Sequence, residues 1–334
     1  MNRSGLSQLT KKFVSLALAL FLVFGVIPAT IIRPLEAKAD NGEIVVDLKN
    51  YGSSGGPKIP SGISGASNSS KIRVVNTGAS PKIFNGNNAH GIYVENGFQG
   101  TLILDNLTIY TDQTSSGPTN SAPIMVDGSR DIFNKYESIT TNVLIRLEGN
   151  NVLHAGYNGQ TYAAGLEVMK GAQITIEGPG SLTAKCTPNG SSGNGGGAGI
   201  GAGNRPKSGG HMVIRSGTIN AYAGYHGAGI GDGWGEHSDG SNPPDFWNGT
   251  LIIYGDAVVR SHGGYHGAGI GGACRSGATD GKDGRGIVLV FPPADVETYS
   301  ANSNRATLGG VKDQVYLGDM SMKDKLPITV KTDP

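Results

Sequence analysis

The feature that most constrains the fold of this chain is an octapeptide that occurs twice. The sequence Gly-Tyr-His-Gly-Ala-Gly-Ile-Gly fills residues 224–231 and returns unchanged at 264–271, 40 residues later. Its second half, Gly-Ala-Gly-Ile-Gly, also stands at 197–201. Repeats with a period of roughly 20 to 50 residues are typical of architectures in which equivalent units stack on one another. The octapeptide therefore predicts a solenoid.

Each repeat unit predicts three short strands. The first strand of each unit has an Ile or Leu at its centre; these centres are Ile92, Ile124, Leu166, Ile200, Ile230 and Ile270. The second strands are expected at 101–106, 142–147, 172–177, 211–216, 250–255 and 286–291. The third strands, each directly after a tight turn, are expected at 107–111, 151–155, 181–185, 218–223, 257–262 and 295–300.

Alternation of apolar and polar residues in these strands puts one face inward, and stacking then buries a continuous apolar column. No stretch of the chain after residue 40 has a convincing helical period. The pattern therefore predicts an all-β chain that folds as a right-handed parallel β-helix, a solenoid of about six or more coils.

The same pattern divides the chain into four parts. Residues 1–39 form a signal peptide, 40–89 N-terminal coils or a cap, 90–305 the β-helix repeats, and 306–334 a C-terminal cap or linker. Strands are expected at 43–48 and 71–75, with a loop at 51–70 between them. Two further short strands are expected at 315–319 and 328–330.

The N-terminus has the composition of a secretory signal. Arg3, Lys11 and Lys12 precede an apolar run at 13–26, and Ala37-Lys38-Ala39 predicts cleavage before Asp40. The alternative, a membrane anchor, is disfavoured because spanning a membrane takes about 20 apolar residues. We therefore expect a secreted or cell-surface, extracellular protein with no membrane span after signal cleavage.

Charge and cysteine content exclude several classes. Residues 1–39 hold five basic side chains and one acidic one, so 22 of the 27 basic and 25 of the 26 acidic side chains would remain. A nearly neutral chain without basic runs is a poor candidate for binding nucleic acid. Two cysteines, Cys186 and Cys274, are too few for a disulfide scaffold, and whether they pair stays open.

The Gly-Ala-Gly-Ile-Gly motif is followed by a strand with the sequence Ser-Gly-Thr-Ile-Asn-Ala-Tyr-Ala-Gly at 216–224. This pattern resembles the GAGIG-repeat parallel β-helix segments of secreted or wall-attached proteins of Gram-positive bacteria. The resemblance covers about residues 166–300 and extends more weakly back to residue 90. It implies a secreted or surface setting and transfers no catalytic residues.

Three insertions interrupt consecutive units between the first and second strands, at 202–210, 232–249 and 272–285. Because the units stack, the insertions are expected side by side on one edge, where solenoids often carry their function. The middle insertion contains both tryptophans of the chain, and aromatic rings beside polar groups suit sugars. The expected carbohydrate-binding residues are Trp234, His237, Trp247, Arg205 and Arg275. The alternatives are that the tryptophans cover the loop's own backbone and that the charged residues are only solvated.

An enzyme is the second function that these insertions allow. Glycoside hydrolysis needs two carboxylates about 5 to 9 Å apart. The candidate catalytic residues are Asp232, Glu236, Asp239 and Asp245, and a polysaccharide lyase would use Arg205, Lys207 and Arg275 on the same edge. No nucleophile, phosphate-binding or zinc-protease motif accompanies them.

Metal sites are weaker candidates. Asp239, Asp280 and Asp283 lie in tight turns rich in oxygen ligands, which favours calcium, but none fits a known calcium-loop pattern. His226 and His266 occupy equivalent repeat positions and suggest either a metal pair or a structural ladder along one edge, with Tyr225 and Tyr265 stacked beside them. The ladder is favoured because the half-repeat has Gly196 at that position.

Taken in order of preference, the sequence supports three functions. The first is a secreted or surface-associated protein that binds a polysaccharide or surface glycan through the insertion loops. The second is a polysaccharide lyase or glycoside hydrolase that uses the same loops. The third is a structural stalk or adhesin segment whose ligand is a protein.

Overall fold

The computed structural model describes eight ranges of the chain with their side chains: 91–111, 122–128, 139–156, 163–187, 196–203, 209–233, 249–273 and 288–299. Outside these ranges it describes only the backbone of strands. These are β1 (Glu43–Asp47), β2 (Ile63–Ser64), β3 (Ile72–Val74), β4 (Ser80–Phe84), β5 (Asn87–Asn88), β22 (Gln314–Tyr316), β23 (Ile328–Thr332) and the ends of β20 and β21.

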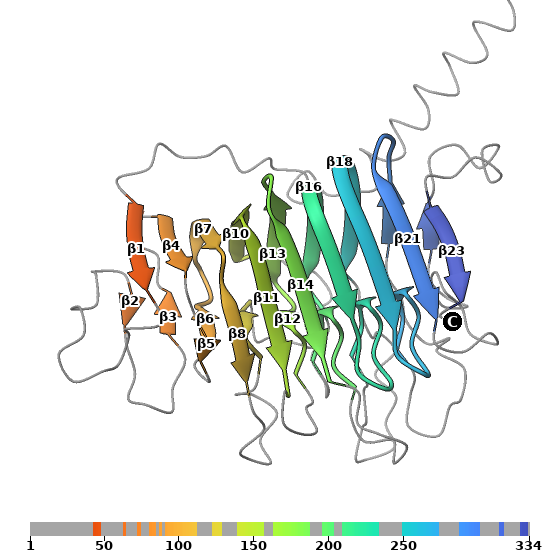
Figure 1. Cartoon of the computed structure of the whole chain (residues 1–334), viewed down its shortest axis with the longest axis horizontal. Helices are drawn as coiled ribbons and strands as arrows, with labels where there is room; N and C mark the ends of the chain where they lie inside the picture. Colours follow the sequence, from red (N-terminus) through yellow and green to blue (C-terminus); the bar gives the residue numbers. More distant parts are fainter. Residues whose placement is uncertain are drawn as a thin grey trace, which may run out of the picture.

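The described residues form strands and turns and contain no helix, so the chain is all-β in this part. The strands belong to two sheets, one of 15 strands and one of 8 strands. Every pairing between strands is parallel except that of β2 with β3. Figure 1 shows the strands side by side in sequence order along the long axis of the molecule.

The predicted first strands form the smaller sheet, together with β3 and β2. They are β6 (Ile92–Val94), β9 (Ile124–Val126), β12 (Leu166–Val168), β15 (Ile200–Gly201), β17 (Ile230–Gly231) and β19 (Ile270–Gly271). Each predicted Ile or Leu centre pairs with the centre of the next unit, from Ile92 with Ile124 to Ile230 with Ile270. The repeat register read from the octapeptide is therefore confirmed.

The second and third strands form the larger sheet. The second strands are β7 (Gln99–Asp105), β10 (Thr141–Glu148), β13 (Ala172–Glu177), the first parts of β16 (His211–Tyr222) and β18 (Thr250–Gly263), and β20 (Ile287–Val290). The third strands are β8 (Thr108–Thr111), β11 (Asn150–Ala155), β14 (Ser181–Cys186), the second parts of β16 and β18, and β21 (Asp295–Ser300).

Two details differ from the sequence-based expectation. The turn expected between second and third strands is absent in β16 and β18, which continue as single strands through Gly217 and Gly255, both with positive φ. At the C-terminus, β22 pairs in parallel with β20, and β23 with β21. The two short strands expected there therefore extend the stack.

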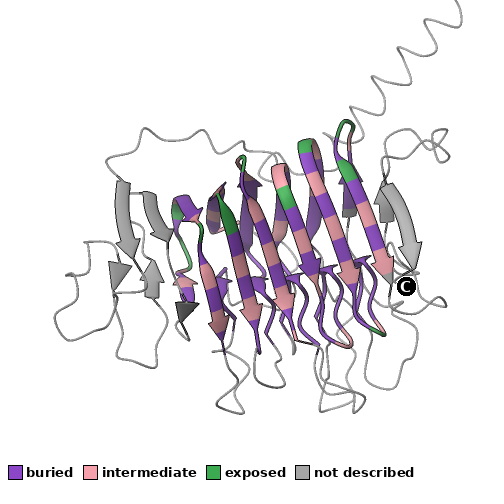
Figure 2. Cartoon of the chain, viewed as in Figure 1, coloured by how far each residue is buried: buried purple, intermediate pink, exposed green. Residues whose placement is uncertain are grey.

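One apolar cluster fills the interior between the two sheets. It contains residues from all three kinds of strand, for example Ile200 from a first strand, Ile214 from a second and Ile219 from a third, each 1% exposed or less. Figure 2 shows the resulting alternation of buried and half-buried residues along the strands. Parallel strands that curl around a shared core leave each unit dependent on its neighbours for burial.

Glycines allow the first strands to stack closely. Gly201, Gly231 and Gly271 follow the central isoleucine in consecutive units and pair with each other in register. All three have a φ between 124° and 136°. A Cβ on Gly231 would lie 2.1 Å from the carbonyl oxygen of Gly271, so a side chain here would collide with the neighbouring backbone.

Candidate functional site

Of the site residues predicted from the insertions, Asp232 alone falls within the described part of the chain. Asp232 is 3% exposed, its N–H donates to the Gly271 carbonyl (3.0 Å), and its carbonyl accepts from the Ala228 N–H (2.8 Å). The other predicted residues lie outside the described residues. They are Arg205, Lys207, Trp234, Glu236, His237, Asp239, Asp245, Trp247, Arg275, Asp280 and Asp283.

The starting points of the insertions are described, and they lie together. Gly203 and Gly233 are the second residues of the first and second insertions, and a Cβ on Gly233 would lie 2.3 Å from the Gly203 carbonyl oxygen. The third insertion leaves the same corner after β19, whose Gly271 pairs with Gly231 of β17. The insertions therefore start from adjacent positions on one edge.

A second feature lies on the outward face of the third strands. Consecutive third strands are in register so that one outward position forms a column of aromatic and basic side chains. We refer to this column as the aromatic ladder; it consists of Tyr110, His154, Lys185, Tyr222, His262 and Tyr299. All six side chains are half-buried. Five steps between strands, about 4.8 Å each, give the aromatic ladder a length of about 24 Å.

The rings of the aromatic ladder contact one another. His262 stacks between Tyr222, at 4.5 Å between centroids and 13° between planes, and Tyr299, at 4.1 Å and 2°. Lys185 places its Nζ 5.0 Å from the centre of the Tyr222 ring, in a cation–π contact. At the other end Tyr110 and His154 meet edge to face at 5.9 Å. The ring faces are therefore used within the ladder, and the ring edges point outward.

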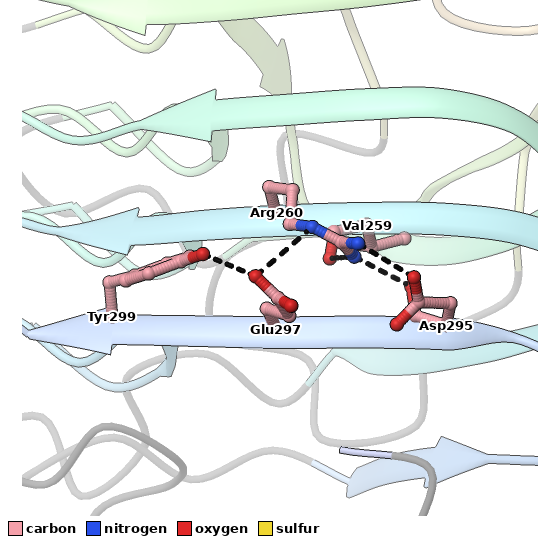
Figure 3. Close-up of polar contacts among 5 residues, drawn as sticks. All are labelled: Val259, Arg260, Asp295, Glu297 and Tyr299. Carbon is pink, nitrogen blue, oxygen red and sulfur yellow. Dashed lines mark hydrogen bonds and ion pairs between the residues drawn. The ribbon is translucent and has the colours of Figure 1, made fainter. Parts of the chain in front are cut away.

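Charged side chains next to the ladder pair with one another (Figure 3). Arg260 lies between two carboxylates, with Nη2 2.6 Å from Asp295 Oδ2 and Nε 3.2 Å from Glu297 Oε2. The Tyr299 hydroxyl donates to the same Glu297 carboxylate. Partial burial alone lowers the pKa of Arg260, but the two carboxylates outweigh it and raise the pKa above its usual value. The Arg260 charge is thus paired, and the three side chains together carry a net charge of about −1.

The two copies of the octapeptide bring four rings together at the corner that follows the third strands. We refer to Tyr225, His226, Tyr265 and His266 as the corner stack. The two tyrosines stack at 5.1 Å and 11°, and the two histidines stack at 4.9 Å and 11°. The ladder arrangement favoured from the sequence is therefore confirmed for these residues. Within the described residues, no group of three or more His, Cys, Asp or Glu side chains is placed to hold a metal ion.

Three groups, the half-buried His154 and His211 and the buried Cys186, have shifted pKa values. Burial lowers the pKa of His211 to about 4, and its Nδ1 accepts the Thr250 N–H at 3.2 Å. Burial, with a contribution from Lys185, lowers the pKa of His154, whose Nε2 lies 2.7 Å from Thr187 Oγ1. Cys186 is a buried free thiol whose pKa is raised by burial to about 12. A thiol with this pKa is not an effective nucleophile at neutral pH.

Sequence reasoning had identified the corner stack but not the aromatic ladder. The third strands containing Tyr222, His262 and Tyr299 were predicted, but the residues opposite one another were not. Aligned from their first residues, the strands predicted at 218–223 and 257–262 place Tyr222 opposite Ser261, one position away from its partner His262. Tyr110 and His154 both stand fourth in the strands predicted at 107–111 and 151–155, so aligning those two strands would have paired them.

Comparison of the chain with models of protein families, with curated proteins and with solved structures gives no match. The resemblance to GAGIG-repeat segments therefore stays an expectation that rests on the motif itself. Among the described residues, no helix is long and apolar enough to cross a membrane.

Proposed function

We propose that the chain is a right-handed parallel β-helix that binds a carbohydrate polymer on its outer surface without cleaving it. The parallel register of all three kinds of strand supports this fold. The handedness rests on a general rule, since about 98% of crossovers between parallel strands of one sheet are right-handed.

The observation that carries the proposal is the aromatic ladder. It places an aromatic or basic side chain at the equivalent position of consecutive strands over about 24 Å. A linear polymer also repeats its chemical groups along its length. Each unit of such a polymer can therefore meet an equivalent group of the protein, and several weak contacts add up through their high effective concentration.

The chemistry of this face favours a carbohydrate over other polymers. Ring edges of Tyr222, His262 and Tyr299 offer polar atoms, and the adjacent outward column offers amide and hydroxyl groups from Asn220 and Thr183. Sugar hydroxyls both donate and accept hydrogen bonds, so they are complementary to a surface of this mixed kind. Nucleic acid would require a basic surface, whereas Arg260 is paired with two carboxylates.

The insertions would complete the site. Their starting points share one edge, and Trp234 and Trp247 would add aromatic platforms to it. The proposed setting is secreted or at the cell surface, on the basis of the signal-like residues 1–39 and the GAGIG motif. The proposal does not depend on calcium or on the carboxylates of the middle insertion. The experiment below includes calcium as a condition and names the carboxylates to substitute if the polymer is cleaved.

The experiment is native electrophoresis of the purified chain through gels cast with a panel of polysaccharides, with and without calcium, followed by staining for the polymer. Retardation with intact polymer is the expected result. A cleared zone would instead establish an enzyme and make Asp232, Glu236, Asp239 and Asp245 the first residues to substitute. Free migration in every gel would contradict carbohydrate binding. The structural stalk would then be the remaining candidate function.

A matched pair of variants tests the location. Tyr222→Ala removes a ring from the aromatic ladder, while Tyr254→Ala removes a half-buried tyrosine from the outward face of the second strand in the next unit, where it lies under Arg215. We expect retardation to fall in the first variant and to persist in the second. Equal loss in both variants would contradict a role for the ladder face.

A further inference from the structure

Tyr265 differs from every other aromatic residue described. It is 44% exposed, and it is the one large hydrophobic side chain classed as exposed in the described part of the chain. Its equivalent in the preceding unit, Tyr225, is half-buried although it stands in an identical octapeptide. An exposed aromatic ring on an otherwise well-packed surface is a common mark of a binding position.

Within the described residues, other aromatic rings contact Tyr265 on one face and at its edge. Tyr225 stacks against it at 5.1 Å between centroids, and His266 meets it edge-on at 4.7 Å with the planes at 90°. Among the described residues, these two rings are the aromatic neighbours of Tyr265. By contrast, His262 of the aromatic ladder has a ring on each face. The second face of the Tyr265 ring has no aromatic neighbour in the described part of the chain, and the side chain is 44% exposed.

The backbone under Tyr265 is held rigidly. The Gly264 N–H donates to Gly227, the His266 N–H to Tyr225 and the Gly267 N–H to Gly264, at 3.0, 3.0 and 3.1 Å. A Cβ on Gly264 or on Gly267 would lie 1.8 Å from a carbonyl oxygen of the preceding turn. The two turns are therefore nested in contact, and a ligand would meet a ring that is already ordered, which lowers the entropic cost of binding.

We infer that the available face of the Tyr265 ring stacks against a pyranose ring of a neutral polysaccharide, while Tyr225 stacks on the opposite face of Tyr265. A sugar presents a flat patch of C–H groups to an aromatic face while its hydroxyls remain at the rim. A neutral polymer fits better than an acidic one because Arg260, on the strand that ends just before Tyr265, is paired with both Asp295 and Glu297, and these three side chains carry a net charge of about −1. This inference rests on the proposed carbohydrate binding and names the residue and the polymer class.

The test compares three substitutions of Tyr265 in gels containing hydroxyethyl cellulose, laminarin or galactomannan, with alginate as the acidic polymer. The polymer concentration is varied to obtain a dissociation constant. For the neutral polymer that retards the natural chain, we expect Tyr265→Ala to weaken binding by about fivefold or more, which is about 1 kcal/mol. Tyr265→Phe keeps the ring and should stay within about twofold, and Tyr265→Trp should bind more tightly because its face is larger.

The melting temperature of each variant is measured beside its binding, and Tyr254→Ala serves as the control for loss of a tyrosine elsewhere. A natural chain that binds neutral polymers, with Tyr265→Ala binding equally well, would overturn this inference and leave the proposed function standing. Equal loss in Tyr265→Phe and Tyr265→Ala would overturn stacking in favour of the hydroxyl. Retardation by alginate alone would overturn the neutral class. A natural chain that no polysaccharide retards would overturn both proposals.

Discussion

The inner and outer columns of this protein both follow the pairing of stacked strands, but they differ in burial and in the residue types that they accept. The inner column, Ile92 to Ile270, contains only Ile and Leu, and each of its side chains is 0% exposed. The aromatic ladder on the outside contains tyrosine, histidine and lysine, all half-buried. Close packing restricts the inner positions to branched aliphatic side chains of one size, since protein interiors are as dense as organic crystals. The outer positions need only stack on their neighbours, so several side chains satisfy them.

The comparison separates the residues that stabilise this molecule from those to which we assign the proposed binding. The inner column holds the units together through burial of apolar surface, which is the largest favourable contribution to folding. The ladder contributes smaller stacking energies while keeping polar edges in contact with solvent. Substitutions inside should therefore affect folding, and substitutions outside should affect binding with little effect on folding.

The largest effect is expected where backbones of the first strands touch. Gly231→Ala would place a Cβ 2.1 Å from the Gly271 carbonyl at a φ of 136°. We expect a loss of more than about 4 kcal/mol in the free energy of unfolding, seen in thermal unfolding by circular dichroism. Gly97→Ala is the control, because Gly97 also has positive φ, 91°, but nothing lies within 4 Å of its Cβ position. Equal losses in both variants would show that the strain comes from φ alone and not from the close approach.

The next effect concerns the inner column itself. Ile230→Ala removes a fully buried side chain and should cost about 2–5 kcal/mol, because a cavity remains between the sheets. Tyr222→Ala, on the outside of the adjacent strand, should cost clearly less. Chemical denaturation of both variants measures the difference. If Tyr222→Ala were the more destabilising of the two, the distinction between the inner and outer columns would fail.

A pH effect of intermediate size is expected from His211. Its pKa is about 4 when folded, against 6.5 for the unfolded residue, so between these values the unfolded chain binds more protons. Stability should therefore be complete above pH 6.5 and fall as pH drops towards 4, by about 1–2 kcal/mol because the ring remains partly exposed. His211→Asn keeps an acceptor for the Thr250 N–H without titrating. Denaturation curves from pH 7 to pH 4 should show a smaller slope in this variant, and an unchanged slope would exclude His211 as the cause.

The smallest effect concerns stacking in the ladder. A double-mutant cycle with Tyr222→Ala and His262→Ala should give a coupling energy of about 0.5–1.5 kcal/mol, because the rings lie 4.5 Å apart. Tyr110→Ala combined with Tyr222→Ala should be additive, since two units separate those residues. Additivity in both pairs would mean that the ladder contributes no stacking energy.

Much of the fold followed from local patterns. Alternation of apolar residues located the second and third strands, and the motif with a central Ile or Leu located the first strands to the residue. The merging of strands in β16 and β18 was missed because a turn signal such as Gly217 does not reveal whether pairing continues through it. The corner stack was found because its residues occur in two identical octapeptides.

The sequence by itself determined that this chain is made of repeated three-strand units, and which residues of each strand point inward, because burial imposes a strict alternation on every strand. The tertiary structure decided which outward residues form one column. The steps along the ladder from Tyr110 to Tyr299 are 44, 31, 37, 40 and 37 residues, because insertions of unequal length separate the strands. Spacing along the chain therefore does not encode the column, and backbone hydrogen bonding between stacked strands does. The same stacking decides that Tyr265 is exposed while Tyr225, in the same sequence, supports it.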